Sequence, residues 1–304
     1  MSSLRELYKT IFFSLLAYRD LGFEGTRVFK GAQKGPKIAA LAMTHGNEPA
    51  GLSLFNFLEK NQLIKGEFWL ILGNSLAATR YFESLPEESH KFRGVNINFN
   101  RLSPDLLQNE DPEASRLKQI LQTLSQADYI LDFHSTSLPS PTMLIPNAAA
   151  QNLNFQGFKC FDVILTDIIS LMRHKPIIGY LDLPGFVIEC GPHESESSFE
   201  FVTRFAETFL ASFDMIPDKN NANIEVKEPE IFQVFEAVWF PDDDFEMVKD
   251  FYNFEPVYKN QLLAVSKKTK HQILAHEDCH IVFPFPKGKE KGSREEAFFL
   301  ARKV

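Results

Sequence analysis

The chain has 304 residues, of which 44% are apolar, and this suffices for one large domain, or a large and a small one, with a sizeable buried core. Its formal net charge of −8 argues against a nucleic-acid-binding protein, because contacts with phosphates need a clustered basic face. The apolar run at residues 11–18 is too short to span a bilayer. We therefore expect an amphipathic N-terminal helix and no membrane partner.

Short apolar runs alternate with helical segments through most of the chain. Residues 37–43 predict a buried strand, and Pro49 then stands where the first turn of a helix running to about Leu63 accepts a proline. The other predicted elements are strands at residues 68–72, 129–133 and 186–189 and helices at residues 112–124 and 198–212. This alternation predicts an α/β fold with a largely parallel sheet flanked by helices.

The composition changes near residue 218. Residues 218–230 are polar and resemble a linker, and the remainder has short runs of Val, Phe and Ile between charged turns. We therefore predict two domains, residues 1–217 and a smaller, mainly β domain at residues 218–304.

The three cysteines are odd in number and widely spaced: Cys160, Cys190 and Cys279. This spacing fits neither a disulfide framework nor a zinc module built from cysteines. We therefore expect a reducing, cytoplasmic location.

Polar residues stand at the carboxyl ends of the predicted strands, where ligands bind in open α/β sheets. His45 and Glu48 follow the first strand, Asn74 follows the second, and His134 and Glu189 end the third and fourth. A lone histidine at a strand end is more often a turn or core residue, but several such residues at one edge favour a site. Two histidines and a carboxylate leave zinc an open position, as in catalytic sites. The pattern predicts one Zn²⁺ at His45, Glu48 and His134, with Glu189 free to act as general base.

Four segments carry a resemblance to a known family: THGNE (44–48), RGVNINFNR (93–101), LDFHST (131–136) and IECGPH (188–193). In this order they resemble the motifs of the succinylglutamate desuccinylase and aspartoacylase family of zinc deacylases, relatives of the zinc carboxypeptidases. The resemblance implies a zinc-carboxypeptidase-like fold, the same three zinc ligands and general base, and hydrolysis of the amide bond of a small N-acyl amino acid.

The resemblance also implies roles for residues between these strands. Arg93 stands seven residues ahead of the Asn100-Arg101 pair, as an arginine does in the family, and is expected to stabilise the oxyanion. Arg80 is the competing candidate. Asn100 and Arg101 are expected to hold a substrate carboxylate through paired hydrogen bonds. The family's Asp-Leu-Asn-Arg begins here with Asn98, so one carboxylate is lost.

Further residues on the same rim have two interpretations. Asp132 precedes His134 by two, so it is either an acceptor that orients a ligand histidine or an ordinary buried carboxylate. His193 is either a residue that contacts the substrate or an ordinary turn residue. A second group of histidines has metal-like spacing, but we favour solvated or packed side chains there: His271, His276 and His280.

The substrate is less well defined than the chemistry. Aspartoacylases use a further arginine shortly before the base and a tyrosine of the C-terminal domain, but Arg173 lies too far upstream of Glu189 and no tyrosine follows Tyr258. The acyl group, the amino acid and association into a homo-oligomer stay open. The alternatives are a carboxypeptidase-like or peptide-amide hydrolase, and a zinc-binding pseudo-enzyme without activity.

Overall fold

The computed structural model describes residues 3–108, 110–136, 139–153, 159–217, 228–240, 242, 244–287 and 296–304. The chain divides into two compact units, one of residues 1–163 with 174–229 and the other of residues 164–173 with 230–304. Residues 218–227 of the predicted linker lie outside the described residues, so the domain boundary after residue 217 stays a prediction.

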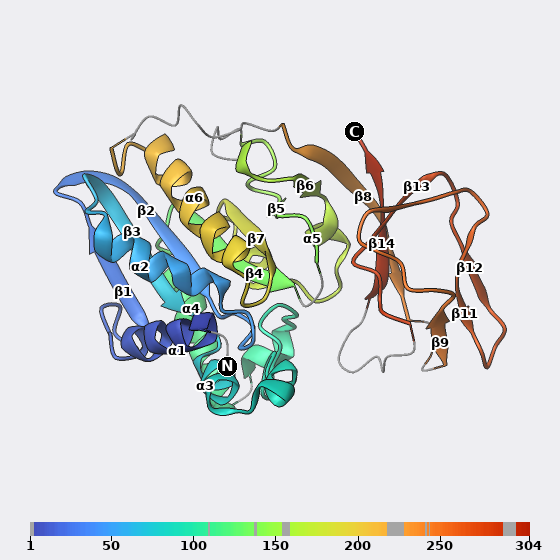
Figure 1. The fold of residues 1–304 in the computed structure, drawn as a ribbon, viewed down its shortest axis with the longest axis horizontal. Coiled ribbons are helices and arrows are strands. Elements are labelled where there is room, and N and C mark those ends of the chain that lie inside the picture. The colour runs from blue at the N-terminus through green and yellow to red at the C-terminus, as the bar shows by residue number, and fades with distance from the viewer. Residues whose placement is uncertain are drawn as a thin grey trace. The chain divides into compact units, whose positions relative to one another are not determined.

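A mixed sheet with the strand order β1-β3-β2-β4-β7-β5 forms the first unit (Figure 1). Its strands are β1 (Thr26–Lys30), β2 (Gln33–Ala42), β3 (Lys65–Leu72), β4 (Tyr129–Thr136), β5 (Met143–Pro146) and β7 (Gly185–Pro192). β2 pairs in parallel with β3 and β4, and β4 pairs in parallel with β7. β1 and β5 pair antiparallel with β3 and β7. The predicted α/β fold with a largely parallel sheet is confirmed.

The helices of this unit bury apolar side chains. They are α1 (Ser3–Leu16), α2 (Ser53–Lys60), α3 (Ser75–Glu83), α4 (Pro112–Leu124) and α6 (Glu196–Ser212). α2 and α6 lie side by side on one face of the sheet (Figure 1). Phe205 of α6 packs against Phe133 of β4 with ring centroids 5.9 Å apart. Because successive strand residues point to opposite faces, Asp132 and His134 leave the sheet on the other side from Phe133.

Two helices differ from the predicted elements. The predicted helix after Pro49 is a short 3₁₀ turn at Ala50–Leu52 followed by α2, which ends at Lys60 because Asn61 takes an extended backbone. α3 was not predicted at all. It begins where the Asn74 side chain accepts a hydrogen bond from the Ala77 amide at 3.0 Å, as an N-cap does.

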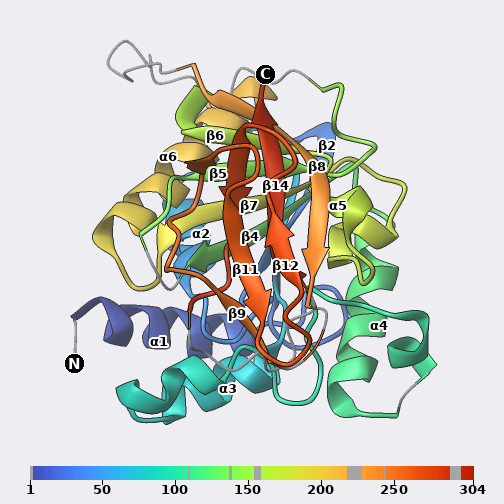
Figure 2. The ribbon, with the colours of Figure 1, turned by 90° about the vertical axis from the view of Figure 1, so that its right-hand side faces the viewer.

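The second unit is mainly β, as predicted for the smaller C-terminal region. Its elements are β6 (Val163–Thr166), α5 (Ile168–Leu171), β8 (Glu230–Trp239), β9 (Phe245–Met247), β10 (Glu255–Val257), β11 (Leu262–Ser266), β12 (Gln272–Leu274), β13 (Cys279–Val282) and β14 (Glu296–Lys303). β8 and β14 run side by side as an antiparallel pair (Figure 2), and β12, β11 and β9 form a separate three-stranded sheet. Residues 164–173, which were assigned to the first domain from sequence, cluster with this unit.

Two further observations concern membrane-spanning helices and disulfide bonds. Among the described residues, no helix is both long and apolar enough to cross a membrane. The cysteines Cys160, Cys190 and Cys279 are all free thiols.

Candidate metal and active site

The first two residues of the site lie in the turn that follows β2. His45 is fully buried and Glu48 is 2% exposed, and His45 Nδ1 lies 2.8 Å from Glu48 Oε1. Gly46, between them, packs so closely that a Cβ atom would lie 2.6 Å from the carbonyl oxygen of Phe92 and would also meet Ala77. Only glycine fits there, and the turn is therefore held tightly in place.

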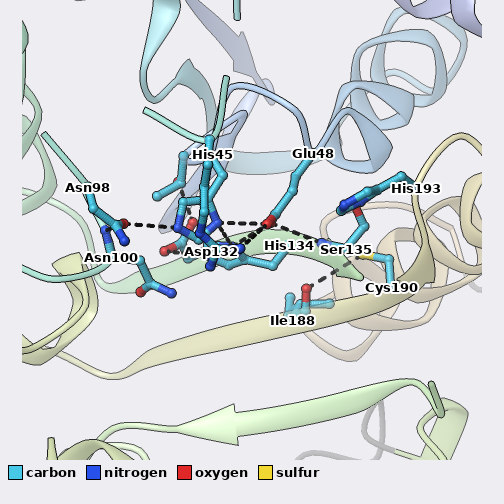
Figure 3. A network of polar contacts seen from close by, with 12 residues as sticks. His45, Glu48, Asn98, Asn100, Asp132, His134, Ser135, Ile188, Cys190 and His193 are labelled. Atoms are coloured by element: carbon cyan, nitrogen blue, oxygen red, sulfur yellow. Dashed lines mark hydrogen bonds and ion pairs between the residues drawn. The ribbon is translucent and has the colours of Figure 1, made fainter. Parts of the chain in front are cut away.

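His134, on β4, completes a group of three (Figure 3). Its Nδ1 lies 2.8 Å from Glu48 Oε2 and 3.1 Å from His45 Nδ1. In the part of the chain that the structure describes, these three side chains form the one group of His, Cys, Asp or Glu whose ligand atoms lie within 4.8 Å of one another. The residues predicted from the strand ends are thus brought together.

The outer nitrogens of both rings face acceptor oxygens. His45 Nε2 lies 3.1 Å from Asn98 Oδ1, which also accepts the backbone N–H of Asn100 at 2.9 Å and is thereby identified as the oxygen (Figure 3). His134 Nε2 lies 3.1 Å from Asp132 Oδ2. Both rings therefore turn Nδ1 inward, towards each other and the Glu48 carboxylate. Two imidazole nitrogens and one carboxylate are a donor set that fits Zn²⁺.

The charges in this group also suit a cation. Burial, helped by the nearby Arg93, lowers the pKa of His45 to about 4. Burial opposes charge on Glu48, yet the two histidines hold its pKa well below its usual range. Burial likewise opposes charge on His134, but Asp132 and Glu48 raise its pKa well above the ordinary value. The ring of His134 thus lies between two carboxylates, where positive charge is stabilised.

Glu189 lies beside this group on the neighbouring strand. It is the register partner of His134 across β4 and β7, so both side chains leave the sheet on the same face. Its Oε2 atom is buried and has no hydrogen-bond partner among the described residues. Burial raises the pKa of Glu189 to about 7, and Glu48 and Asp132 contribute in the same direction, against His134 and Arg93. This carboxyl group is therefore poised to exchange a proton near neutral pH.

The raised pKa predicts that Glu189→Gln stabilises the protein in a chelating buffer at about pH 8 but not at about pH 4. A carboxyl with a pKa of about 7 in the folded chain, against an ordinary 4.5, makes folding less favourable as pH rises between these values. The gain at high pH should be at most about 3 kcal/mol. Urea unfolding at both pH values measures it, with the exposed Glu200→Gln as control. An equal effect of Glu189→Gln at both pH values would contradict the raised pKa.

Comparison with known families decides the classification. A sequence profile described as the succinylglutamate desuccinylase/aspartoacylase catalytic domain matches residues 34–208, more than half of the chain. The chain belongs to the succinylglutamate desuccinylase/aspartoacylase family. Members of this family are deacylases that act on amide bonds. A search among curated proteins finds no match.

Several solved structures have the same fold as this chain. Succinylglutamate desuccinylase from Vibrio parahaemolyticus is 15% identical, with a TM-score of 0.65 over 90% of this chain and 82% of that one. The enzyme from Vibrio cholerae is also 15% identical, with a TM-score of 0.62 over 90% and 83% of the two chains. Murine aminoacylase 3 is 19% identical, with a TM-score of 0.56 over 90% and 97%. At these identities the comparisons establish the fold.

The family motif around the Asn-Arg pair forms one wall of the site. Arg93 Nη1 lies 3.4 Å from Glu48 Oε1, with a side chain that is 52% exposed. Asn100 lies beside Asn98 (Figure 3), and Arg101 Nη1 donates to the carbonyl oxygen of Asn100 at 2.7 Å. The competing Arg80 is exposed on α3. Of the two arginines considered for the oxyanion, the structure places Arg93 beside the candidate ligand Glu48.

His193 lies next to the ligand group through Ser135. The Ser135 amide donates to Glu48 Oε2 at 3.2 Å, and Ser135 Oγ lies 2.8 Å from His193 Nδ1 (Figure 3). Burial lowers the pKa of His193. His193 is therefore a half-buried, neutral hydrogen-bonding group at the rim of the site.

The second series of histidines does not join any metal group among the described residues. His276 is 71% exposed and its Nε2 lies 3.6 Å from Glu236 Oε1, while His271 is exposed and His280 is half-buried on β13. The solvated or packed role that we favoured from the sequence agrees with these positions.

Three residues at the site were not assigned from the sequence. Asn98 orients His45, Ser135 contacts Glu48, and Thr44 donates to Asp132 Oδ1 at 2.5 Å. Thr44 and Ser135 directly precede or follow a ligand, but serine and threonine are too common for that position to identify them. Asn98 could have been identified as a site residue, because it stands at the start of the family's Asn-Arg motif.

Proposed function

We propose that the protein is a zinc-dependent hydrolase that cleaves the amide bond of an N-acyl amino acid. One observation carries the proposal: the ligand atoms of His45, Glu48 and His134 lie within 4.8 Å of one another, and Glu189, whose Oε2 has no hydrogen-bond partner among the described residues, lies alongside. Family membership supports it, because the family comprises deacylases. Two of the proteins that share the fold, succinylglutamate desuccinylase and aminoacylase 3, support an acylated amino acid as substrate through the reactions that their names describe.

Zinc and Glu189 would have different roles in hydrolysis. One zinc ion held by His45, Glu48 and His134 would supply a Lewis acid and lower the pKa of a water molecule towards ~7. Glu189 would take the proton from the attacking water as the new C–O bond forms. It would then deliver this proton to the amine nitrogen as the C–N bond breaks, which releases a carboxylate and a free amino acid.

The remaining residues would position the substrate. Arg93, whose guanidinium lies 3.4 Å from Glu48 Oε1, would stabilise the negative charge that develops on the carbonyl oxygen. Asn100 has a buried Oδ1 without a hydrogen-bond partner among the described residues, and it would bind substrate together with Arg101. His193, which is hydrogen-bonded to Ser135 next to Glu48, would also contact the substrate.

Replacing Arg93 should slow the reaction much more than replacing Arg80. We expect Arg93→Ala to lower kcat/KM by on the order of a hundredfold, because a lost oxyanion donor costs about 3 kcal/mol of barrier stabilisation. Arg93→Lys should recover only part of the loss. Steady-state kinetics on purified variants measures both. A larger loss in Arg80→Ala, the matched control on α3, would reassign the oxyanion contact.

The function itself is tested by metal analysis combined with a hydrolysis screen. The panel contains N-acetyl, N-succinyl and N-formyl amino acids, with short peptides as a second panel, assayed under the reducing conditions that the free cysteines and an expected cytoplasmic location support. One zinc per chain and release of a free amino acid would support the proposal. Turnover of peptides alone would favour a carboxypeptidase-like enzyme, and bound zinc without any turnover would favour a pseudo-enzyme.

A further inference from the structure

Glu113 is a buried carboxylate at the start of α4 to which the proposed reaction gives no role. Its side chain is 1% exposed. Oε1 accepts hydrogen bonds from the Val95 amide at 3.0 Å and from the Asn74 side chain at 2.5 Å. Oε2 accepts the amides of Asn96 at 2.6 Å and Ile97 at 2.9 Å. One carboxylate therefore binds three consecutive backbone amides of a loop.

The position of Glu113 explains why a charge is stable there. It lies in the first turn of α4, where the helix dipole favours negative charge. Four donors also replace the hydration that a buried carboxylate loses. If the carboxylate were removed, the amides of residues 95–97 would lose their charged acceptor while partly buried, and unpaired amides of this kind are unfavourable.

The anchored loop holds the candidate metal site from two directions. Directly after Ile97, Asn98 binds the outer nitrogen of His45 at 3.1 Å. At the other end of the loop, the carbonyl oxygen of Arg93 accepts the amide of Gly46 at 3.0 Å. The turn that carries His45 is thus bonded to residues on both sides of the segment that Glu113 holds.

We propose that Glu113 is a positioning residue for the active site. It fixes segment 93–98 against the carboxyl end of the sheet, through Asn74 at the end of β3, and thereby sets the places of Arg93 and Asn98 beside His45. The effects on zinc binding and on catalysis rest on the proposed function, whereas the anchoring of the loop does not.

Glu113→Gln is the first test, because it keeps the size of the side chain and removes its charge. We expect hydrogen exchange of the amides of residues 95–97 to accelerate by about tenfold or more, with exchange in β2 and β4 unchanged. Asp128→Asn is the control, since the exposed Asp128 also accepts a backbone amide, that of Lys37 within β2 at 2.8 Å, away from the carboxyl end of that strand. It should leave exchange at residues 95–97 unchanged.

Two further readouts separate positioning from simple loss of structure. Zinc affinity of Glu113→Gln should fall by about tenfold, because Asn98 no longer holds His45 firmly. On the substrate found by the screen, kcat should fall by about a hundredfold with a smaller change in KM, because Arg93 acts in the transition state. Asp128→Asn should change neither quantity.

A second variant covers the case in which Glu113→Gln does not fold. Asn74→Asp keeps the acceptor for the Ala77 amide but places a second carboxylate against Glu113, so it should also release the loop. Unchanged exchange at residues 95–97 in the folded variants would overturn the inference. Faster exchange with unchanged zinc affinity would also overturn it. If the wild type hydrolysed nothing in the panel, the proposed function would fail, and exchange at residues 95–97 would still decide whether Glu113 anchors the loop.

Discussion

Glu189→Gln is expected to lower kcat by about a thousandfold or more while the protein still binds one zinc per chain. The amide has nearly the same shape as the carboxylate but cannot take a proton from water. Glu189 is not one of the three residues whose ligand atoms converge. Its buried Oε2 and a pKa of about 7 instead suit a group that accepts and returns a proton in each cycle.

The experiment needs metal content and turnover from the same preparation. Zinc is measured by elemental analysis, and hydrolysis is followed by release of the free amino acid from the best substrate of the screen. Glu200→Gln, an exposed carboxylate of α6, should behave as the wild type. Turnover by Glu189→Gln within about tenfold of the wild-type rate would assign proton transfer to another group.

Loss of the metal should eliminate activity and also destabilise the fold. We expect His134→Ala to bind no stoichiometric zinc, because only two of the three candidate ligands remain in the buried site. For the wild type, zinc at about a thousand times its dissociation constant should raise the free energy of unfolding by about 4 kcal/mol over the chelated protein. Calorimetry with and without chelator measures this difference, and readdition of one equivalent of zinc should restore turnover.

Histidines of the second unit provide the matched control for this experiment. His271→Ala combined with His276→Ala should keep one zinc per chain and full activity, because both side chains are exposed and join no metal group among the described residues. Loss of zinc in this double variant, or retention of zinc in His134→Ala, would move the metal site away from β4.

The sheet and the three candidate ligands could be predicted because both depend on local patterns. Buried parallel strands appear as short apolar runs, and the ends of such strands meet at one edge of the sheet. His45, Glu48, His134 and Glu189 follow such strands or stand near their carboxyl ends, so topology places all four at one edge of the sheet, where the ligand atoms of the first three converge. The roles of Arg93, Asn100 and Arg101 depended on the family resemblance, because loop residues have no periodic pattern.

The supporting contacts could not be predicted, because they join residues far apart in the sequence. Glu113 binds Asn74 across 39 positions, and Thr44 binds Asp132 across 88. Neither pairing has a spacing rule, and buried polar residues look like surface residues in a sequence. α3 was missed because its apolar face is short and its start depends on a single cap at Asn74. The assignment of residues 164–173 to the second unit likewise depends on tertiary contacts.

The close packing at Gly46 has a consequence for how the proposed site would acquire a metal ion. The turn is confined by α3 and by the backbone of Phe92, and the outer nitrogens of His45 and His134 each lie 3.1 Å from an oxygen, that of Asn98 and that of Asp132 respectively. The ligand geometry is therefore preorganised by the protein scaffold. The loss of conformational entropy needed to assemble the site occurs mostly when the chain folds, and little of it is left for the moment at which the ion arrives.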